Sequence, residues 1–163
     1  MFTKIILIIL IALIIPLALA MGAFMQNRLP WTDTPGFGKR LRTYLTTNIA
    51  ETSFDPVRPE LLIHDYPLQQ DNILPVVEQA MLSLGWDILV SNKTKQSIHA
   101  VVTTPLWRFK DDVIVTLQPV AGNDGTRVGV RASARSGRGD FGTNTRHILD
   151  LYSAIENEIK QHR

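Results

Sequence analysis

The chain has 163 residues, of which 45% are apolar, and its 17 basic and 15 acidic side chains give a formal net charge of +2. This length suits one modest domain and excludes two independent ones, because small domains bury only about 60–70% of the surface that the unfolded chain exposes. The small charge excess argues against binding to duplex DNA, so no nucleic-acid partner is expected. The absence of cysteine excludes disulfides, thiolate chemistry and cysteine-based zinc sites.

An uncharged, strongly apolar run from Ile5 to Met25 follows the N-terminal Lys4. A helix that rises about 1.5 Å per residue would cross the roughly 30 Å hydrocarbon core of a bilayer over such a run. The same residues also resemble a secretory signal peptide, in which Ala18-Leu19-Ala20 would be the cleavage motif. The apolar character continues past this motif, which favours an uncleaved anchor. We therefore expect residues 1–27 to form an N-terminal transmembrane helix or a signal peptide.

The start of the chain also predicts where the protein is located. A short positive segment followed by an apolar one is typical of export, so we expect a single-pass protein of a bacterial inner membrane with an extracytoplasmic soluble domain. Cleavage after Ala20 would instead give a secreted or periplasmic protein. Basic residues between Arg28 and Arg42 compete with the N-terminal charges under the positive-inside rule and leave the orientation open.

Residues 28–58 combine several prolines and glycines with scattered polar residues. This composition predicts a membrane-proximal linker, with a short helical turn near residues 40–48. A strand is expected next, over residues 60–64. The linker would separate the N-terminal segment from a single folded domain over residues 59–163.

The segment after this strand has the periodicity of an amphipathic helix. Its apolar residues between Ile73 and Leu84 fall on one face. Asp71 or Asn72 can cap its start, and Gly85 suits the position just after its end. Four strands are then expected between groups of turn-forming residues. They cover residues 86–90, 97–103, 112–118 and 126–135.

The last two strands form a predicted hairpin around residues 121–125. Pairing Leu117 with Val128 and Val115 with Val130 places every apolar side chain of the hairpin on one face. A register shifted by one residue would mix the two faces, so the apolar pattern favours this pairing.

The chain ends in an amphipathic helix over residues 143–160. The apolar face of each amphipathic helix must be buried against another element, and so must the apolar face of the sheet. These needs predict an α+β fold, a two-layer sandwich in which an antiparallel sheet of four or five strands is covered by two helices.

The densest polar segment extends from the last predicted strand into the last helix. Its glycines, Gly137, Gly139 and Gly142, match the dinucleotide-binding motif G-x-G-x-x-G. A dinucleotide site needs a second parallel strand after the helix, and this chain ends within the helix. A Rossmann site is therefore excluded.

Two interpretations of the start of the last helix remain open. Its backbone N–H groups, with Arg138 and Arg146 close by, would suit a phosphate or carboxylate group. Alternatively, Asp140 or Thr143 caps the helix, and the arginines pair with carboxylates such as Asp112.

Asp111 and Asp112 stand at the entry to a predicted strand, where successive side chains point to opposite faces. The two carboxylates therefore cannot easily share a metal ion or a proton. In the predicted register Asp112 faces outward, diagonal to Arg131 and Arg135, and we expect an ion pair rather than an acid/base dyad. The four histidines lack the spacing of a ligand set, so neither a metal site nor a cofactor is expected.

One protein family resembles this chain from about residue 55 to the C-terminus. The shared residues are Ile98-x-Ala100, then Phe109-x-Asp111-Asp112-Val113, then Val128-x-Val130-Arg131-x-Ser133-x-Arg135-x-Gly137-x-x-Asp140-x-Gly142-x-Asn144-x-x-Arg146-x-Ile148. They resemble the domain of unknown function family 1499, which is found in bacteria and plants. This chain has Ala132 and Ala134 at positions that are often serine in the family, which weakens a role for those hydroxyls. The resemblance implies no activity, but it implies that six residues belong together: Asp112, Arg131, Arg135, Asp140, Asn144 and Arg146.

These observations predict a membrane-anchored, non-enzymatic binding or accessory module. The membrane partner would contact residues 5–25, and an anionic lipid or a protein would contact the arginine-rich segment. The alternatives are a small hydrolase or isomerase that uses an Asp–Arg cluster, or a structural subunit of a membrane complex. The candidate binding residues are Asp112, Arg131, Arg135, Arg138, Asp140, Asn144 and Arg146.

Overall fold

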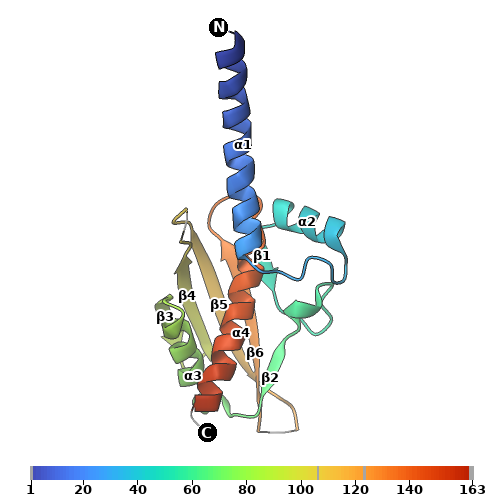
Figure 1. The fold of residues 1–163 in the computed structure, drawn as a ribbon. Helices are drawn as coiled ribbons and strands as arrows, with labels where there is room; N and C mark the ends of the chain where they lie inside the picture. The colour runs from blue at the N-terminus through green and yellow to red at the C-terminus, as the bar shows by residue number, and fades with distance from the viewer. Residues whose placement is uncertain (1, 106, 123, 162–163) are drawn as a thin grey trace.

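The computed structural model describes residues 2–105, 107–122 and 124–161, and for residues 17, 20, 23, 24 and 26 it describes the backbone alone. The described residues form four α-helices, one short 3-10 helix and one antiparallel sheet of six strands (Figure 1). In chain order the elements are α1 (Phe2–Gln26), α2 (Phe37–Thr46), β1 (Ile49–Glu51), η1 (Pro59–Leu61), β2 (His64–Tyr66), α3 (Gln70–Ser83), β3 (Asp87–Asn92), β4 (Ser97–Thr103), β5 (Lys110–Pro119), β6 (Thr126–Ala134) and α4 (Thr143–Gln161).

The sheet has the strand order β1-β6-β5-β4-β3, and β2 also pairs with β6. β1 pairs with residues 131–133 of β6 and β2 with residues 126–128, so the two short strands share one edge. The predicted α+β class is confirmed, but the sheet has six strands rather than four or five. β1 was missed because a strand of three residues is too short to show an alternating pattern. The strand expected over residues 60–64 begins only at His64, because Pro59–Leu61 form η1.

The hairpin register predicted from the apolar pattern is confirmed. Leu117 pairs with Val128 and Val115 with Val130, and all four side chains belong to the buried core. α3 and α4 pack on this face of the sheet and complete the two-layer sandwich (Figure 1). The opposite face is open to solvent, as the exposed side chain of Ile114 illustrates.

The ends of the two covering helices lie close to their predicted positions. Gly85 follows α3 with a φ of 73°, in the left-handed conformation expected just after a helix. The predicted caps of α3 are wrong, because Asp71 and Asn72 lie within its first turn and Gln69 precedes the helix without a side-chain capping bond. Asp71 still places a negative charge near the helix N-terminus, where it is favourable.

Residues 28–58, the predicted linker, contain α2 and β1 and are joined to the domain by a buried ion pair. Arg40 of α2 is fully buried, and its guanidinium donates hydrogen bonds to the two carboxylate oxygens of Glu60 at 2.5 and 2.9 Å. It also donates to the hydroxyl of Tyr44 and to two carbonyl oxygens of the preceding loop. Hydrogen bonding to Glu60 holds the pKa of Arg40 above its usual value. Much of this segment is therefore packed against the domain.

α1 projects from the rest of the molecule as one helix (Figure 1). The large apolar side chains between Ile5 and Ile15 are 46–66% exposed, since no other element packs against them. Among the described residues, no helix has both the length and the apolarity needed to cross a membrane. The anchor or signal helix expected over residues 5–25 therefore stays a prediction.

Candidate functional site

The seven candidate residues lie in two regions of the fold. Asp112 in β5, Arg131 in β6 and Arg135 just after β6 lie on the open face of the sheet. The others lie in the loop before α4 or in α4 itself, and they are Arg138, Asp140, Asn144 and Arg146.

A hydrogen-bonded network joins three strands on the open face. Arg135 donates from Nε to Asp112 Oδ2 at 2.8 Å and from Nη2 to Asp112 Oδ1 at 2.7 Å. His99 of β4 places Nε2 2.8 Å from the same Oδ1. The hydrogen bonds from Arg135, together with the smaller contribution of His99, lower the pKa of Asp112 to about 2 despite its partial burial. Asp112 is thus ionised at neutral pH and suits an ion pair rather than a proton donor.

The sequence did not indicate His99 as a member of this network. Its side chain alternates with the buried Ile98 and Ala100, so strand periodicity places it on the outward face. No pairing of β4 with β5 was predicted, and this pairing brings it next to Asp112. The missing information was therefore the order of the strands.

Arg131 and Asp112 are diagonal neighbours, as expected, because Asp112 pairs with Ser133, but no ion pair joins the two side chains in the described chain. Arg131 Nε lies 3.6 Å from Glu51 Oε2, and both of these side chains are well exposed. Glu51 stands opposite Arg131 in the pairing of β1 with β6. The unforeseen β1 thus provides the nearest carboxylate, and an exposed pair of this length contributes little stability.

Asp140 caps α4. Its Oδ1 accepts a hydrogen bond from the N–H of Gly142 at 2.8 Å, and its Oδ2 accepts one from the N–H of Asn144 at 3.0 Å. Burial raises the pKa of Asp140, while these two bonds act in the opposite direction. The carboxylate therefore occupies the place that an external anion would take at the helix N-terminus.

The other backbone donors at the start of α4 are also engaged within the protein. The N–H groups of Asp140 and Phe141 donate to the carbonyl oxygens of Thr47 and Tyr44, and the N–H of Thr143 donates to the carbonyl oxygen of Asp140. Every backbone N–H from residue 140 to residue 144 thus has a protein acceptor. Of the two interpretations left open by the sequence, the geometry matches capping rather than an anion site.

Two of the three glycines of the G-x-G-x-x-G motif serve close packing. A Cβ added to Gly139 would lie 2.4 Å from the carbonyl oxygen of Leu45 in α2. A Cβ added to Gly142 would lie 2.2 Å from the Leu29 side chain, and Gly142 also has a φ of 83°. The motif therefore lets the loop before α4 lie against α2 and against the residues that follow α1.

Asparagine side chains reinforce this contact. Asn27 Nδ2 donates to the carbonyl oxygen of Phe141 at 2.9 Å. Asn144 is fully buried and donates to the carbonyl oxygen of Asn48 at 2.8 Å, while Asn48 donates to the carbonyl oxygen of Gly137 at 2.9 Å. Asn144 therefore joins α4 to the segment between α2 and β1.

The remaining two candidates, Arg138 and Arg146, differ in whether they form an ion pair. Arg146 pairs with Asp150 one turn further along α4, and both side chains are partly buried. Arg138 is exposed in the loop before α4 and forms no ion pair with any carboxylate of the described chain. Of the candidate arginines, Arg138 and the weakly paired Arg131 are therefore the least engaged with carboxylates of the described chain.

A second polar contact is buried between α4 and the sheet. His147 Nε2 lies 3.0 Å from Asp111 Oδ2, with both side chains at most 10% exposed, and the Trp86 ring packs edge-on against His147. Asp111 and Asp112 thus point to opposite faces, as alternation predicted. In the described part of the chain, no group of three or more His, Asp or Glu side chains could hold a metal ion.

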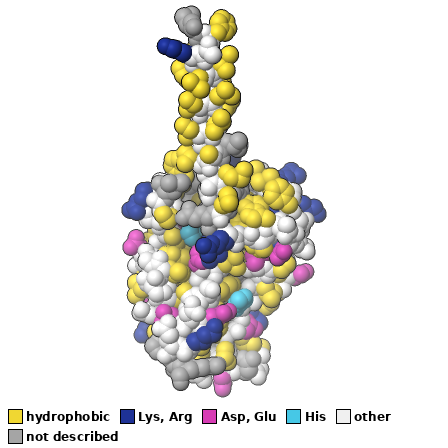
Figure 2. All heavy atoms as spheres, in the orientation of Figure 1, with side chains coloured by type: hydrophobic (Ala, Val, Ile, Leu, Met, Phe, Trp, Pro, Cys, Tyr) yellow, Lys and Arg dark blue, Asp and Glu magenta, His cyan; other side chains and the backbone are white. Residues whose placement is uncertain are grey.

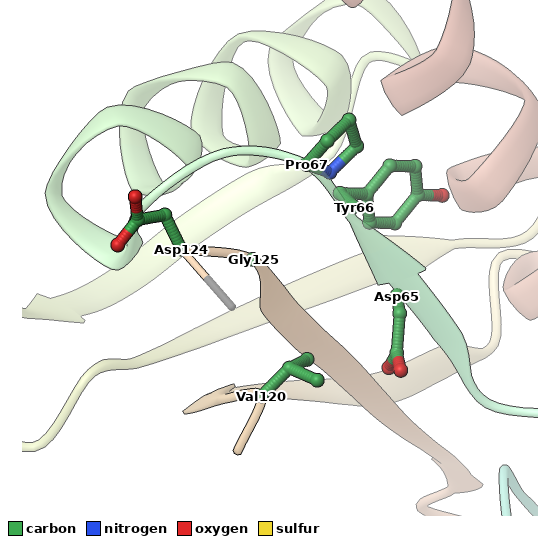
Figure 3. A pocket seen from close by; sticks show the side chains of 6 residues that line it. All are labelled: Asp65, Tyr66, Pro67, Val120, Asp124 and Gly125. Atoms are coloured by element: carbon green, nitrogen blue, oxygen red, sulfur yellow. The ribbon is translucent and has the colours of Figure 1, made fainter. Parts of the chain in front are cut away.

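A surface hollow of about 340 Å³ lies beside β2 and the connection between β5 and β6 (Figure 3). Asp65, Tyr66 and Asp124 are among the residues that line it. The two carboxylates point in different directions (Figure 3), and Asp65 accepts two hydrogen bonds from Arg127 at 2.7 Å. The hollow contains none of the seven candidates, and its carboxylates do not converge on a shared ligand.

A family model described as protein of unknown function (DUF1499) matches residues 40–155, which is more than half of the chain and includes every candidate residue. The crystal structure of TTHA0849 from Thermus thermophilus is similar at 9% sequence identity and a TM-score of 0.38, over 70% of this chain and 97% of that chain. No curated protein matches the chain. The family expected from the sequence is confirmed. The chain belongs to the DUF1499 family of proteins of unknown function.

Proposed function

We propose that this protein is a non-enzymatic binding domain that α1 holds at a bacterial inner membrane, with the folded domain on the extracytoplasmic side. The observation that carries the proposal is the exposed apolar surface of α1. Moving one Leu or Ile side chain out of water stabilises a protein by about 1.5–3 kcal/mol. The many exposed side chains between Ile5 and Ile15 would together favour a lipid environment strongly.

The start of the chain supports the orientation. Lys4 precedes an apolar run, as in segments that direct export. Cleavage after Ala20 would release the same domain as a secreted or periplasmic protein. In either case the domain would work outside the cytoplasm.

Two features favour binding over catalysis. Asp112 has a pKa near 2 because of Arg135, so it is a poor general acid or base at neutral pH. Asp140 is engaged with two backbone N–H groups at the start of α4. These are the carboxylates on which a hydrolase or isomerase mechanism would depend, whereas the accessible Arg131 and Arg138 can contact an anionic group or a protein partner.

Anchoring is tested by extracting membranes from bacteria that express the full chain. We expect the protein to stay in the pellet after washes with alkaline carbonate and with urea, because both remove proteins that are held only at the surface. The intact mass should correspond to the uncleaved chain. A full-length protein that the washes release would overturn the anchor, and a mature chain beginning at Met21 would establish the secreted alternative.

A further inference from the structure

Several connections meet at the end of the domain from which α1 projects (Figure 1). Asn27, just after α1, donates to the carbonyl oxygen of Phe141 in the loop before α4. That loop contacts α2 through the hydrogen bond from the N–H of Phe141 to the carbonyl oxygen of Tyr44. The β4–β5 connection lies at the same end, since Thr103 pairs with Lys110 and the N–H of Arg135 donates to the carbonyl oxygen of Lys110.

Basic side chains gather at this end, and Figure 2 shows Lys and Arg side chains around the base of α1. They come from the residues after α1, from α2, from the β4–β5 connection, from the start of β5 and from the loop before α4. Each is exposed, and none forms an ion pair with a carboxylate among the residues that the structure describes. They are Arg28, Lys39, Arg42, Arg108, Lys110 and Arg138.

Large apolar side chains lie among these cations. Phe37 is 57% exposed, Leu45 45%, Trp107 54% and Phe109 55%. We call the six cations and these four apolar side chains the collar. Apolar and aromatic side chains next to cations are typical of protein surfaces that lie at the level of lipid headgroups.

Few free acids oppose the collar. Asp33 is exposed in the loop before α2, while Asp111, Asp112 and Asp140 are engaged with His147, Arg135 and the start of α4 respectively. Asp87 and Glu51 are exposed further along the sheet.

The opposite end of the domain has mixed charge. Its exposed acids include Asp71 and Asp124, and its exposed cations include Lys93, Lys95 and Lys160. The collar is thus distinguished from that end by the small number of free acids near its cations and by the exposed apolar side chains among them.

We propose that the collar binds the anionic headgroups of the bilayer that holds α1. The inference rests on the proposed anchoring, which directs this end of the domain toward the membrane surface. Each Lys or Arg close to an anionic leaflet raises the affinity by about fivefold, and salt weakens the attraction. Phe37, Trp107 and Phe109 would then enter the headgroup layer, so the domain would lie against the membrane in a fixed orientation.

The test places the full chain in vesicles whose headgroups carry a spin label that quenches tryptophan fluorescence. Neutral phosphatidylcholine vesicles are compared with vesicles enriched in phosphatidylglycerol. Trp107 is exposed in the collar, whereas Trp86 is buried in the core and serves as an internal reference. The quenching of Trp107 is obtained as the difference between the quenching of the wild type and that of the variant Trp107→Phe.

The collar variant carries Lys39→Glu, Arg42→Glu and Arg138→Glu. Its matched control carries Lys93→Glu, Lys95→Glu and Lys160→Glu, which change the net charge equally at the opposite end. In anionic vesicles we expect quenching of Trp107 in the wild type and in the control. In the collar variant the ratio of docked to undocked domain should fall by roughly 100-fold or more.

Three results would overturn the inference. The first is equal quenching of Trp107 in neutral and anionic vesicles, and the second is no quenching of Trp107 in either kind of vesicle. The third is an equal loss of Trp107 quenching in the collar variant and in the control variant. Carbonate extraction of the same vesicles separates the two proposals. A protein that stays in the vesicles without quenching of Trp107 retains its anchor but lacks the docked collar, and a protein that is extracted lacks the anchor. Near-ultraviolet circular dichroism establishes that each variant is folded.

Discussion

The variant Arg40→Met tests whether the segment between α1 and β2 is part of the folded domain. Arg40 is fully buried and donates five hydrogen bonds, two of them to Glu60, whose side chain is only 10% exposed. Removing the guanidinium leaves a largely buried carboxylate and two carbonyl oxygens without their partner. Breaking a buried ion pair in this way costs about 3–5 kcal/mol.

A loss of this size is large beside the total stability of a domain, which is about 5–15 kcal/mol. It should lower the melting temperature of the full chain in mild detergent by at least about 6 °C, at about 2–8 °C per kcal/mol. The assay is thermal and urea unfolding followed by near-ultraviolet circular dichroism. Arg42→Met is the matched control, because Arg42 lies on the exposed side of the same helix and should change stability by no more than about 0.5 kcal/mol.

The double variant Arg40→Met, Glu60→Gln should be more stable than the sum of the two single losses predicts, because it removes the unpaired carboxylate together with its partner. If Arg40→Met costs less than about 1 kcal/mol, or no more than Arg42→Met, the ion pair does not hold α2 to the domain. The segment would then behave as the free linker that its composition suggests.

Three further predictions concern the loop before α4 and the open face of the sheet. Asp140→Ala removes the cap of α4 and should cost about 0.5–2 kcal/mol in urea unfolding, whereas an unchanged midpoint would mean that the cap is dispensable. Gly142→Ala should destabilise the domain more than Gly122→Ala: the two glycines have φ values of 83° and 86°, but only the Cβ at Gly142 would meet an atom, at 2.2 Å. Because the folded-state pKa of Asp112 is about 2, below its unfolded value, the stability it contributes is present above roughly pH 4 and is lost as the pH falls toward 2. Carbon-13 NMR of the Asp112 carboxyl group should give a titration midpoint near pH 2 in the wild type, and this midpoint should rise toward the ordinary value in Arg135→Gln. A midpoint near pH 4 in the wild type would contradict the ion pair.

The parts of the fold that follow from apolar periodicity could be read from the sequence. Alternation in β5 and β6 gave both the register of Leu117 with Val128 and the outward position of Asp112. The same alternation separated Asp111 from Asp112, and they point to opposite faces of the sheet. Apolar side chains that pack on one face recur at regular intervals along the sequence, and this spacing can be recognised without knowledge of the rest of the fold.

The parts that depend on distant pairing could not be read in this way. β1 has three residues and no detectable period, so its pairing with β6 and the contact between Glu51 and Arg131 were missed. His99 met Asp112 only through the pairing of β4 with β5. Gly139 and Gly142 resembled a phosphate-binding motif, because a glycine required for close packing and one required for ligand approach look the same in a sequence.

Thiol labelling tests the membrane anchor most directly, since the natural chain has no cysteine and a single one can be introduced at will. Ile9→Cys places it within the apolar part of α1, and Ser136→Cys places it in the exposed loop before α4. With a membrane-impermeant maleimide added to intact spheroplasts, we expect Ser136→Cys to react and Ile9→Cys to react only after detergent is added. Equal, rapid labelling of both cysteines without detergent would contradict an anchor embedded in the membrane.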